Sequence, residues 1–111
     1  MATLMLDAAN RGLITMEAIA GVLSEGTARR FGLYPRKGSL EPGADADLTL
    51  VDPNAAWKID NRRLHSKTKL SPWHGRTGIG APVRTILRGQ TIAIQGRPVG
   101  DPTGRLVRAG K

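Results

Sequence analysis

The stretch that decides the fold is residues 38–53, which read Gly-Ser-Leu-Glu-Pro-Gly-Ala-Asp-Ala-Asp-Leu-Thr-Leu-Val-Asp-Pro. The pattern predicts a strand, a tight turn, a second strand and a stop. Pro42-Gly43 suits the central positions of a type II turn, because glycine accepts a positive φ. A short apolar edge follows the turn, formed by Leu48, Leu50 and Val51. Asp52-Pro53 is typical of a strand end.

Before this stretch, apolar residues recur at helical spacing. We expect a first helix from Thr3 to Arg11, ended by Gly12. Thr15 is a natural N-cap for a second helix that runs to about Ser24, with a buried face formed by Ile19, Val22 and Leu23. A third short helix is predicted from Thr27 to Phe31.

After the stretch, Trp57 and Ile59 alternate with charged residues, as on a half-exposed strand. Residues 61–80 are polar and basic without a sustained period, which predicts a long loop. Strands resume at Pro82, with tight turns at Arg88-Gly89 and at Gly96-Arg97. From Asp101 the composition favours a loosely held tail.

The expected fold class is therefore α+β. Residues 1–34 form helices, residues 35–100 form about five short strands with the long basic loop at 61–80, and residues 101–111 form a flexible tail. A sheet this small needs a cover for its apolar face. The helical stripes suit packing on something larger, which indicates a piece of a bigger protein.

Composition excludes several classes of function. The 111 residues contain no Cys, which excludes disulfide scaffolds, Cys-type zinc sites and thiol catalysis. No apolar run reaches the roughly 20 residues of a membrane span, and the start lacks the pattern of a signal peptide, so we expect a cytoplasmic protein. The 17 basic and 9 acidic residues give a net charge of +8. Residues 1–53 carry 5 basic and 7 acidic residues, whereas residues 54–111 carry 12 and 2.

The run from Thr27 to Leu48 resembles the junction near the C-terminus of amidohydrolase-superfamily enzymes, where the last barrel helices pass into a small β-sandwich. Later motifs fit the same order: Leu64-His65-Ser66-Lys67, then Ser71-Pro72-Trp73-His74-Gly75, then Val83 to Gln90. Together they resemble the cyclic-amide branch, which includes dihydroorotase, allantoinase and hydantoinase. The resemblance covers roughly residues 3–100. One departure is that the family often has Asn-Pro where Gly26-Thr27 stand, and we expect the Thr27 hydroxyl to cap the helix instead.

The resemblance implies a parent enzyme with a (β/α)8 barrel, a β-sandwich and one or two divalent metals, usually zinc. The implied ligands are a His-x-His pair on the first strand, a carboxylated Lys on the fourth, His on the fifth and sixth, and Asp on the eighth. None of these motifs occurs in the chain, which matches the family only after the eighth strand. The sequence therefore predicts no catalytic, cofactor-binding or metal-ligating residue here.

Other candidate sites favour structural roles. Zinc needs three or four converging ligands, and the basic loop offers only His65 and His74. Asp45 and Asp47 could share one face of a strand, but carboxylates after a Pro-Gly turn more often bond nearby backbone N–H groups. Asp7 and Glu17 are predicted to be ordinary charges on helix surfaces.

Ser66 and Ser71 lie near histidines in sequence, but nucleophilic catalysis also needs an orienting group and an oxyanion hole. Gly78-Ile79-Gly80 lacks the context of a phosphate-binding loop. A nucleic-acid surface is the remaining candidate, with Trp57 and Trp73 as stacking platforms and a basic stripe of Arg62, Arg63, Lys67, Lys69 and Arg76.

We therefore expect the C-terminal segment of a cyclic amidohydrolase that is inactive by itself. Its expected partner is the missing N-terminal barrel or another subunit, with no membrane contact and only non-specific affinity for nucleic acid. The alternative is a stand-alone module that binds a protein or nucleic acid through its basic half.

Overall fold

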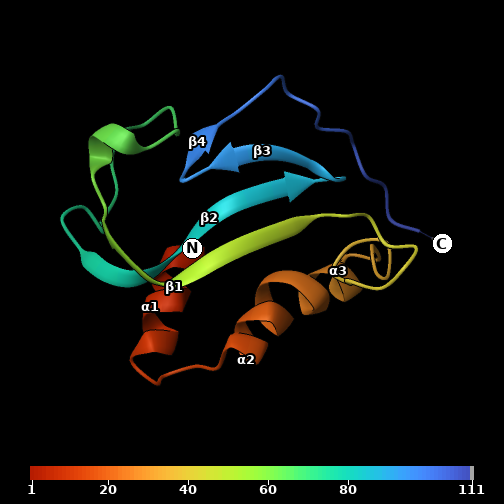
Figure 1. The fold of residues 1–111 in the computed structure, drawn as a ribbon, viewed down its shortest axis with the longest axis horizontal. Helices are drawn as coiled ribbons and strands as arrows, with labels where there is room; N and C mark the ends of the chain where they lie inside the picture. The colour runs from red at the N-terminus through yellow and green to blue at the C-terminus, as the bar shows by residue number, and fades with distance from the viewer. Residues whose placement is uncertain (111) are drawn as a thin grey trace.

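The structure is a computed structural model and describes residues 1–110. Helices lie along one side of a four-stranded antiparallel sheet, and the C-terminal segment returns toward the helices (Figure 1). Helix α1 (Ala2–Asn10) comes first, followed by a helical run over residues 16–30 that we call the long helix. The architecture is a small mixed helix and sheet unit.

The two predicted helix boundaries near the N-terminus are confirmed. Gly12 adopts φ +72° directly after α1, a conformation that ends a helix at little cost for glycine. Thr15 caps the next helix, because its hydroxyl oxygen accepts a hydrogen bond of 3.1 Å from the Ala18 backbone N–H.

The predicted break between the second and third helices is wrong. The long helix runs through α2 (Met16–Ala20), the π-helical segment η1 (Gly21–Glu25) and α3 (Gly26–Arg30). The Thr27 hydroxyl does not cap a helix, since it donates a 2.6 Å hydrogen bond to the Val22 carbonyl five residues back. Of the predicted apolar face, only Ile19 is buried, whereas Val22 is 58% exposed and Leu23 is 41% exposed.

The turn at Pro42-Gly43 is confirmed, with Gly43 at φ +98° and a 3.1 Å bond from the Ala44 N–H to the Glu41 carbonyl. The strand predicted before this turn is wrong, because residues 34–47 form turns and irregular backbone. These residues lead into β1 (Leu48–Lys58).

The predicted stop at Asp52-Pro53 is also wrong, because β1 continues through it. Its pairing with β2 (Thr77–Leu87) shifts register between Leu50 and Val51 and again between Asp52 and Ala56. A proline has no N–H for the ladder, but it is tolerated at such bulges. Strand β2 begins at Thr77, before the predicted Pro82, so it takes the end of the predicted long loop.

Two hairpins complete the sheet, in the order β1-β2-β3-β4. Arg88 and Gly89 both have positive φ and join β2 to β3 (Gln90–Ile94), as in a two-residue hairpin turn. Gln95 and Gly96 form the second turn, one residue earlier than predicted, before β4 (Arg97–Pro98). Residues 1–110 thus hold four strands rather than about five.

The buried core is small and lies mainly where α1 meets β2. Among residues 1–110 the buried side chains are Leu6, Asp7, Ile19 and Ala28. Gly80 has φ +105°, and a Cβ there would lie 2.9 Å from the Leu6 Cβ, so only glycine lets the helix approach β2 this closely. In the part of the chain that the structure describes, no helix combines the length and apolar character that a membrane span requires.

Candidate functional site

The junction between α1 and the sheet is centred on Asp7. This residue is 8% exposed, so the prediction of an ordinary surface charge is wrong. Its Oδ1 accepts a 3.0 Å hydrogen bond from the Ile79 N–H, and its Oδ2 lies 3.1 Å from Arg11 and 3.8 Å from Arg76. A buried carboxylate needs such partners to offset desolvation. Asp7 therefore fixes α1 against β2.

Asn10 and Trp57 reinforce the same junction. Asn10 donates to the carbonyl oxygens of Pro53 at 2.7 Å and Ile79 at 3.0 Å, which bridges β1 and β2 at the bulge. The Trp57 indole N–H donates to the Gly80 carbonyl at 2.8 Å. An open cleft of about 750 Å³ lies beside them, and Asp7, Arg11, Lys58 and Thr77 are among its lining residues.

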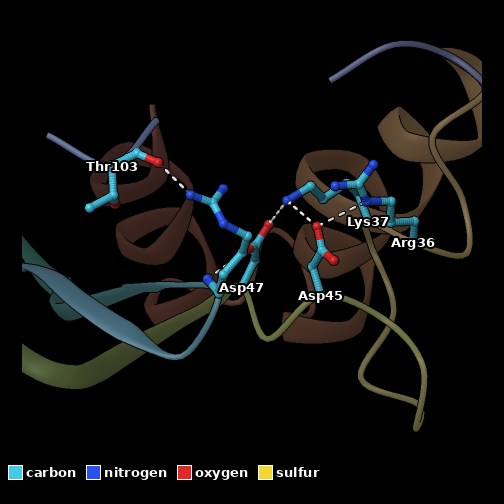
Figure 2. Close-up of polar contacts among 6 residues, drawn as sticks. Arg36, Lys37, Asp45, Asp47 and Thr103 are labelled. Atoms are coloured by element: carbon cyan, nitrogen blue, oxygen red, sulfur yellow. Dashed lines mark hydrogen bonds and ion pairs between the residues drawn. The ribbon is translucent and has the colours of Figure 1, made fainter. Parts of the chain in front are cut away.

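A second polar cluster surrounds Lys37, and we call it the Lys37 cluster (Figure 2). The Lys37 ammonium lies 2.8 Å from Asp45 and also bonds Asp47. Arg36 donates to Asp45 at 3.2 Å, and Asp47 Oδ1 accepts a 2.9 Å bond from the Arg88 backbone N–H. The Asp47 carboxylate therefore holds the 34–47 segment to the β2–β3 turn, and the Asp45 carboxylate pairs with Arg36 and Lys37 inside that segment. The prediction was of bonds to local backbone N–H groups, whereas the N–H that Asp47 binds is 41 positions away.

The charges of the Lys37 cluster stabilise one another. Hydrogen bonds from Lys37 lower the pKa of Asp45 below its ordinary value. Burial raises the pKa of Asp47, but bonds from Lys37 and from the Arg88 N–H outweigh it and leave a lowered pKa. Hydrogen bonds to Asp45 and Asp47 raise the pKa of Lys37. All three groups are charged near neutral pH, which is an arrangement for holding backbone in place rather than for transferring protons.

The same cluster reaches the C-terminal segment. The Arg88 side chain donates to the Thr103 carbonyl, and the Gly110 N–H bonds the Gly32 carbonyl at 2.9 Å. These contacts place residues 101–110 across the hairpin turn and the end of α3 (Figure 1).

The two histidines contact different parts of the backbone. His74 Nδ1 accepts a 3.0 Å bond from the Asn61 N–H, beside the short 3-10 helix η2 (Asn61–Arg63), whereas His65 Nε2 lies 3.1 Å from the Gly96 carbonyl. Ser66 and Ser71 make local turn bonds, to the Thr68 carbonyl at 2.7 Å and from the Trp73 N–H at 3.1 Å. No nucleophile–base pair is among these contacts.

Several residues considered for a nucleic-acid surface make contacts within the chain. The Arg76 guanidinium lies 5.1 Å from the centre of the Trp73 ring and also faces Asp7. Arg62 pairs with Asp60 at 2.7 Å, and this hydrogen-bonded contact holds the pKa of Asp60 well below its usual range. Trp57 is committed to the junction with α1. Trp73, in contrast, is 45% exposed.

Residues 1–110 contain no group of three or more His, Cys, Asp or Glu side chains that could hold a metal ion. The paired carboxylates of the Lys37 cluster already have a cation between them. The described residues thus do not fit a divalent metal centre of the kind that the resemblance implies.

The sequence profile of the amidohydrolase family matches residues 1–93. The chain belongs to the amidohydrolase family. It is 43% identical over 98 residues to a D-phenylhydantoinase from Escherichia coli, an alignment that covers 87% of this chain and 21% of that protein. The family resemblance seen in the sequence is therefore confirmed, and the similar proteins named here are hydantoinases.

Solved structures agree with this assignment. L-hydantoinase (dihydropyrimidinase) from Arthrobacter aurescens matches with a TM-score of 0.85 and 37% identity, over 89% of this chain and 22% of that one. A D-hydantoinase structure matches with a TM-score of 0.85 and 31% identity, over 92% and 22%. The chain thus spans about a fifth of the length of the relatives that it matches.

Local sequence patterns indicate neither the α1 junction nor the position of Lys37 between Asp45 and Asp47. Asp7 and Asn10 gave no signal beyond their polarity on a short helix, because their partners are far along the chain. Lys37 could have been found from its spacing to Asp45 and Asp47, since opposite charges on either side of a tight turn often meet.

Proposed function

We propose that this chain forms the C-terminal helices and the small sheet of a hydantoinase-type hydrolase that acts on C–N bonds of cyclic amides. In this proposal the (β/α)8 barrel, the rest of the β-sandwich and the divalent metal site belong to polypeptide outside these 111 residues. A hydantoin or dihydropyrimidine ring is the proposed substrate class, in preference to the rings of dihydroorotase or allantoinase.

The observation that supports the proposal most is the match to L-hydantoinase, with a TM-score of 0.85 and 37% identity over 89% of this chain. The helix, the irregular segment and the sheet are therefore arranged as in an enzyme that is several times longer. A shared fold alone would not imply a shared reaction, so the identity carries the argument toward the hydantoinases.

The role of this segment would be structural support. In the α1 junction and the Lys37 cluster, the carboxylates of Asp7, Asp45 and Asp47 bond backbone N–H groups and cationic side chains. The reacting groups would come from the remainder of the enzyme. This segment would then stabilise the part of the barrel that carries those groups.

A chimera tests the proposal. This chain would replace the matching 98 residues of the E. coli D-phenylhydantoinase, and the chimera would be assayed for hydantoin hydrolysis. We expect activity within about tenfold of the parent, because homologous segments share a packing surface. The chain alone, supplied with zinc, should show no hydrolysis.

A matched control is the same chimera carrying Asp7→Ala, which should lose stability through the disrupted α1 junction. A folded, metal-loaded chimera without activity would refute the proposal, as would hydrolysis by the isolated chain. The alternative, a stand-alone binding module, requires a sharp thermal melt and a single monomeric species for the chain by itself.

A further inference from the structure

The cleft beside the α1 junction combines apolar walls with positive charge. Its volume is about 750 Å³, which lies within the range typical of sites for small organic ligands. Trp57 and Ile79 are among its lining residues, and Ile79 is 46% exposed although its side chain is large and apolar. Arg11 and Thr77 add polar groups to the same lining. Apolar walls with a few polar groups are typical of ligand sites.

Gly78 gives the cleft its shape. A Cβ at this position would lie 2.3 Å from the Trp57 ring and 2.9 Å from the Asp7 carboxyl carbon, so only glycine lets the strand, the indole and the carboxylate meet. The Trp57 N–H donates a 2.8 Å bond to the Gly80 carbonyl, and the Asp7 carboxylate accepts from the Ile79 N–H. The side chains at the cleft are therefore held in place before any ligand binds.

Two guanidinium groups share one carboxylate at this cleft. Arg11 Nη2 lies 3.1 Å from Asp7 Oδ2, and Arg76 Nη2 lies 3.8 Å from the same oxygen. Each guanidinium carries five N–H donors, and one shared oxygen atom accepts only a few of them. Several donors are therefore left for a second anion beside Asp7.

Both guanidinium groups are accessible and partly fixed. The Arg11 side chain is 55% exposed, and the Arg76 side chain is 36% exposed. Arg76 is held between Asp7 and Trp73, because the centre of the Trp73 ring lies 5.1 Å from its guanidinium carbon. A side chain that is already restrained loses less conformational entropy when it binds a ligand.

The charge that faces α1 favours an anion with a single negative charge. Lys58 also lines the cleft. Neighbouring residues of a strand point to opposite faces of the sheet, so the Lys58 side chain leaves β1 on the face opposite to that of Trp57. On the face of α1, the charges of Arg11 and Arg76 exceed that of Asp7 by one unit. One carboxylate balances this excess.

We propose that this cleft binds a monocarboxylate attached to a flat ring, with the carboxylate on Arg11 and Arg76 and the ring against Trp57 and Ile79. Guanidinium groups bind carboxylates through charge-assisted hydrogen bonds, which are stronger than neutral ones. Contact between the ring and the apolar walls removes both surfaces from water. The inference uses only residues of this chain and does not depend on the proposed function.

The test is a titration of the isotope-labelled chain with sodium benzoate at pH 7, followed by two-dimensional nuclear magnetic resonance. We expect saturable shifts of the Trp57 indole N–H and of the Gly78 backbone N–H. Benzamide has the same ring without the charge and should bind at least about tenfold more weakly, since it forms no charge-assisted bond. Acetate lacks the ring and should also bind at least about tenfold more weakly.

Variants locate the site. Arg11→Met should raise the Kd for benzoate at least about tenfold, because it removes the charged donors. Arg11→Lys and Arg76→Lys keep the charge but lose the planar fork, and each should raise the Kd at least about threefold. Lys67→Met removes one charge from an exposed residue of the basic loop outside the cleft and should stay within about twofold. Calorimetry on the chimera with and without Arg11→Met gives the same comparison in a longer polypeptide.

The outcomes are distinct. Saturable shifts at Trp57 and Gly78 that disappear in Arg11→Met would support the site. Absence of saturable binding, shifts spread over the basic loop, or equal affinity for benzamide would overturn it. Equal losses in Arg11→Met and Lys67→Met would also overturn it, since they would indicate general attraction to a basic chain. Tighter binding of phenyl phosphate than of benzoate would refute the assignment of a monocarboxylate.

Discussion

The α1 junction and the long helix are both helix-to-body contacts, but they are built in opposite ways. Helix α1 buries Leu6 and binds the sheet through Asp7 and Asn10, whose polar atoms are bonded to backbone of β1 and β2. The long helix buries only Ile19 and Ala28 and leaves Met16, Val22 and Leu23 exposed.

The α1 junction is thus fixed by specific polar contacts, whereas most of the long helix is exposed. Polar groups at the α1 junction are specific, because each buried donor or acceptor requires its own partner. The long helix makes few such contacts with the rest of the chain. Substitutions at its exposed positions should therefore change the free energy of unfolding little. Substitutions in the two regions should therefore differ in their effects on stability.

The largest expected effect comes from Asp7→Ala. It removes the acceptor of the part-buried hydrogen bond from the Ile79 N–H and leaves Arg11 and Arg76 without their shared carboxylate. We expect a loss of about 2–3 kcal/mol in the free energy of unfolding, measured by urea denaturation. Glu17→Ala, an exposed acidic residue on the long helix, is the control and should change stability by less than about 0.5 kcal/mol. Equal losses in the two variants would contradict the comparison.

The next effect comes from Lys37→Met. The substitution keeps much of the side-chain volume but leaves Asp45 and Asp47 without the cation between them. We expect a loss of about 1 kcal/mol near neutral pH, smaller than that of Asp7→Ala because the cluster is partly exposed. Arg36→Met is the control, since Arg36 is more exposed and contacts only Asp45.

The Lys37 cluster also predicts a pH dependence. The lowered pKa values of Asp45 and Asp47 give stability that is present above their unfolded pKa, about 3.9, and is lost as the pH falls through the folded values. The raised pKa of Lys37 gives stability that is present below about 10.4 and is lost as the pH rises through the folded value. As the pH is lowered from 7 to 3, the unfolding midpoint should fall less steeply for Lys37→Met than for the unchanged chain. Parallel curves would refute the coupling.

A smaller effect is expected from Thr15→Ala at the start of the long helix. The variant removes the acceptor for the Ala18 N–H and should cost about 1 kcal/mol. Thr15→Ser keeps the oxygen and should be close to neutral in the same denaturation measurement. A loss shared by both variants would show that the methyl group, not the cap, matters.

The Thr15 cap shows what could be predicted from sequence. The cap, the Pro42-Gly43 turn and the Arg88-Gly89 hairpin depend on residues within a few positions, and all three were predicted correctly. Asp7 bonds an N–H that is 72 positions away, so no local pattern could reveal its burial. The passage of β1 through Pro53 depends on a bulge against β2, and the continuity of the long helix depends on an i−5 bond at Gly26. Both features are determined by tertiary packing and not by local sequence.

The smallest expected effect is at Leu23, and it sharpens the comparison most. Leu23 is 41% exposed in η1, and glutamine has nearly the same helix propensity as leucine, so Leu23→Gln should change the stability of the isolated chain by less than about 0.5 kcal/mol. Ile19→Ala, at a buried position of the same helix, should cost about 2 kcal/mol. Leu23 lies one turn after Ile19 on nearly the same side of the helix, so an equal loss at both would mean that the packing at Ile19 extends to Leu23. A neutral Leu23 would show that the packing of the long helix on this unit ends within one turn of Ile19, as the exposures of 7% and 41% indicate.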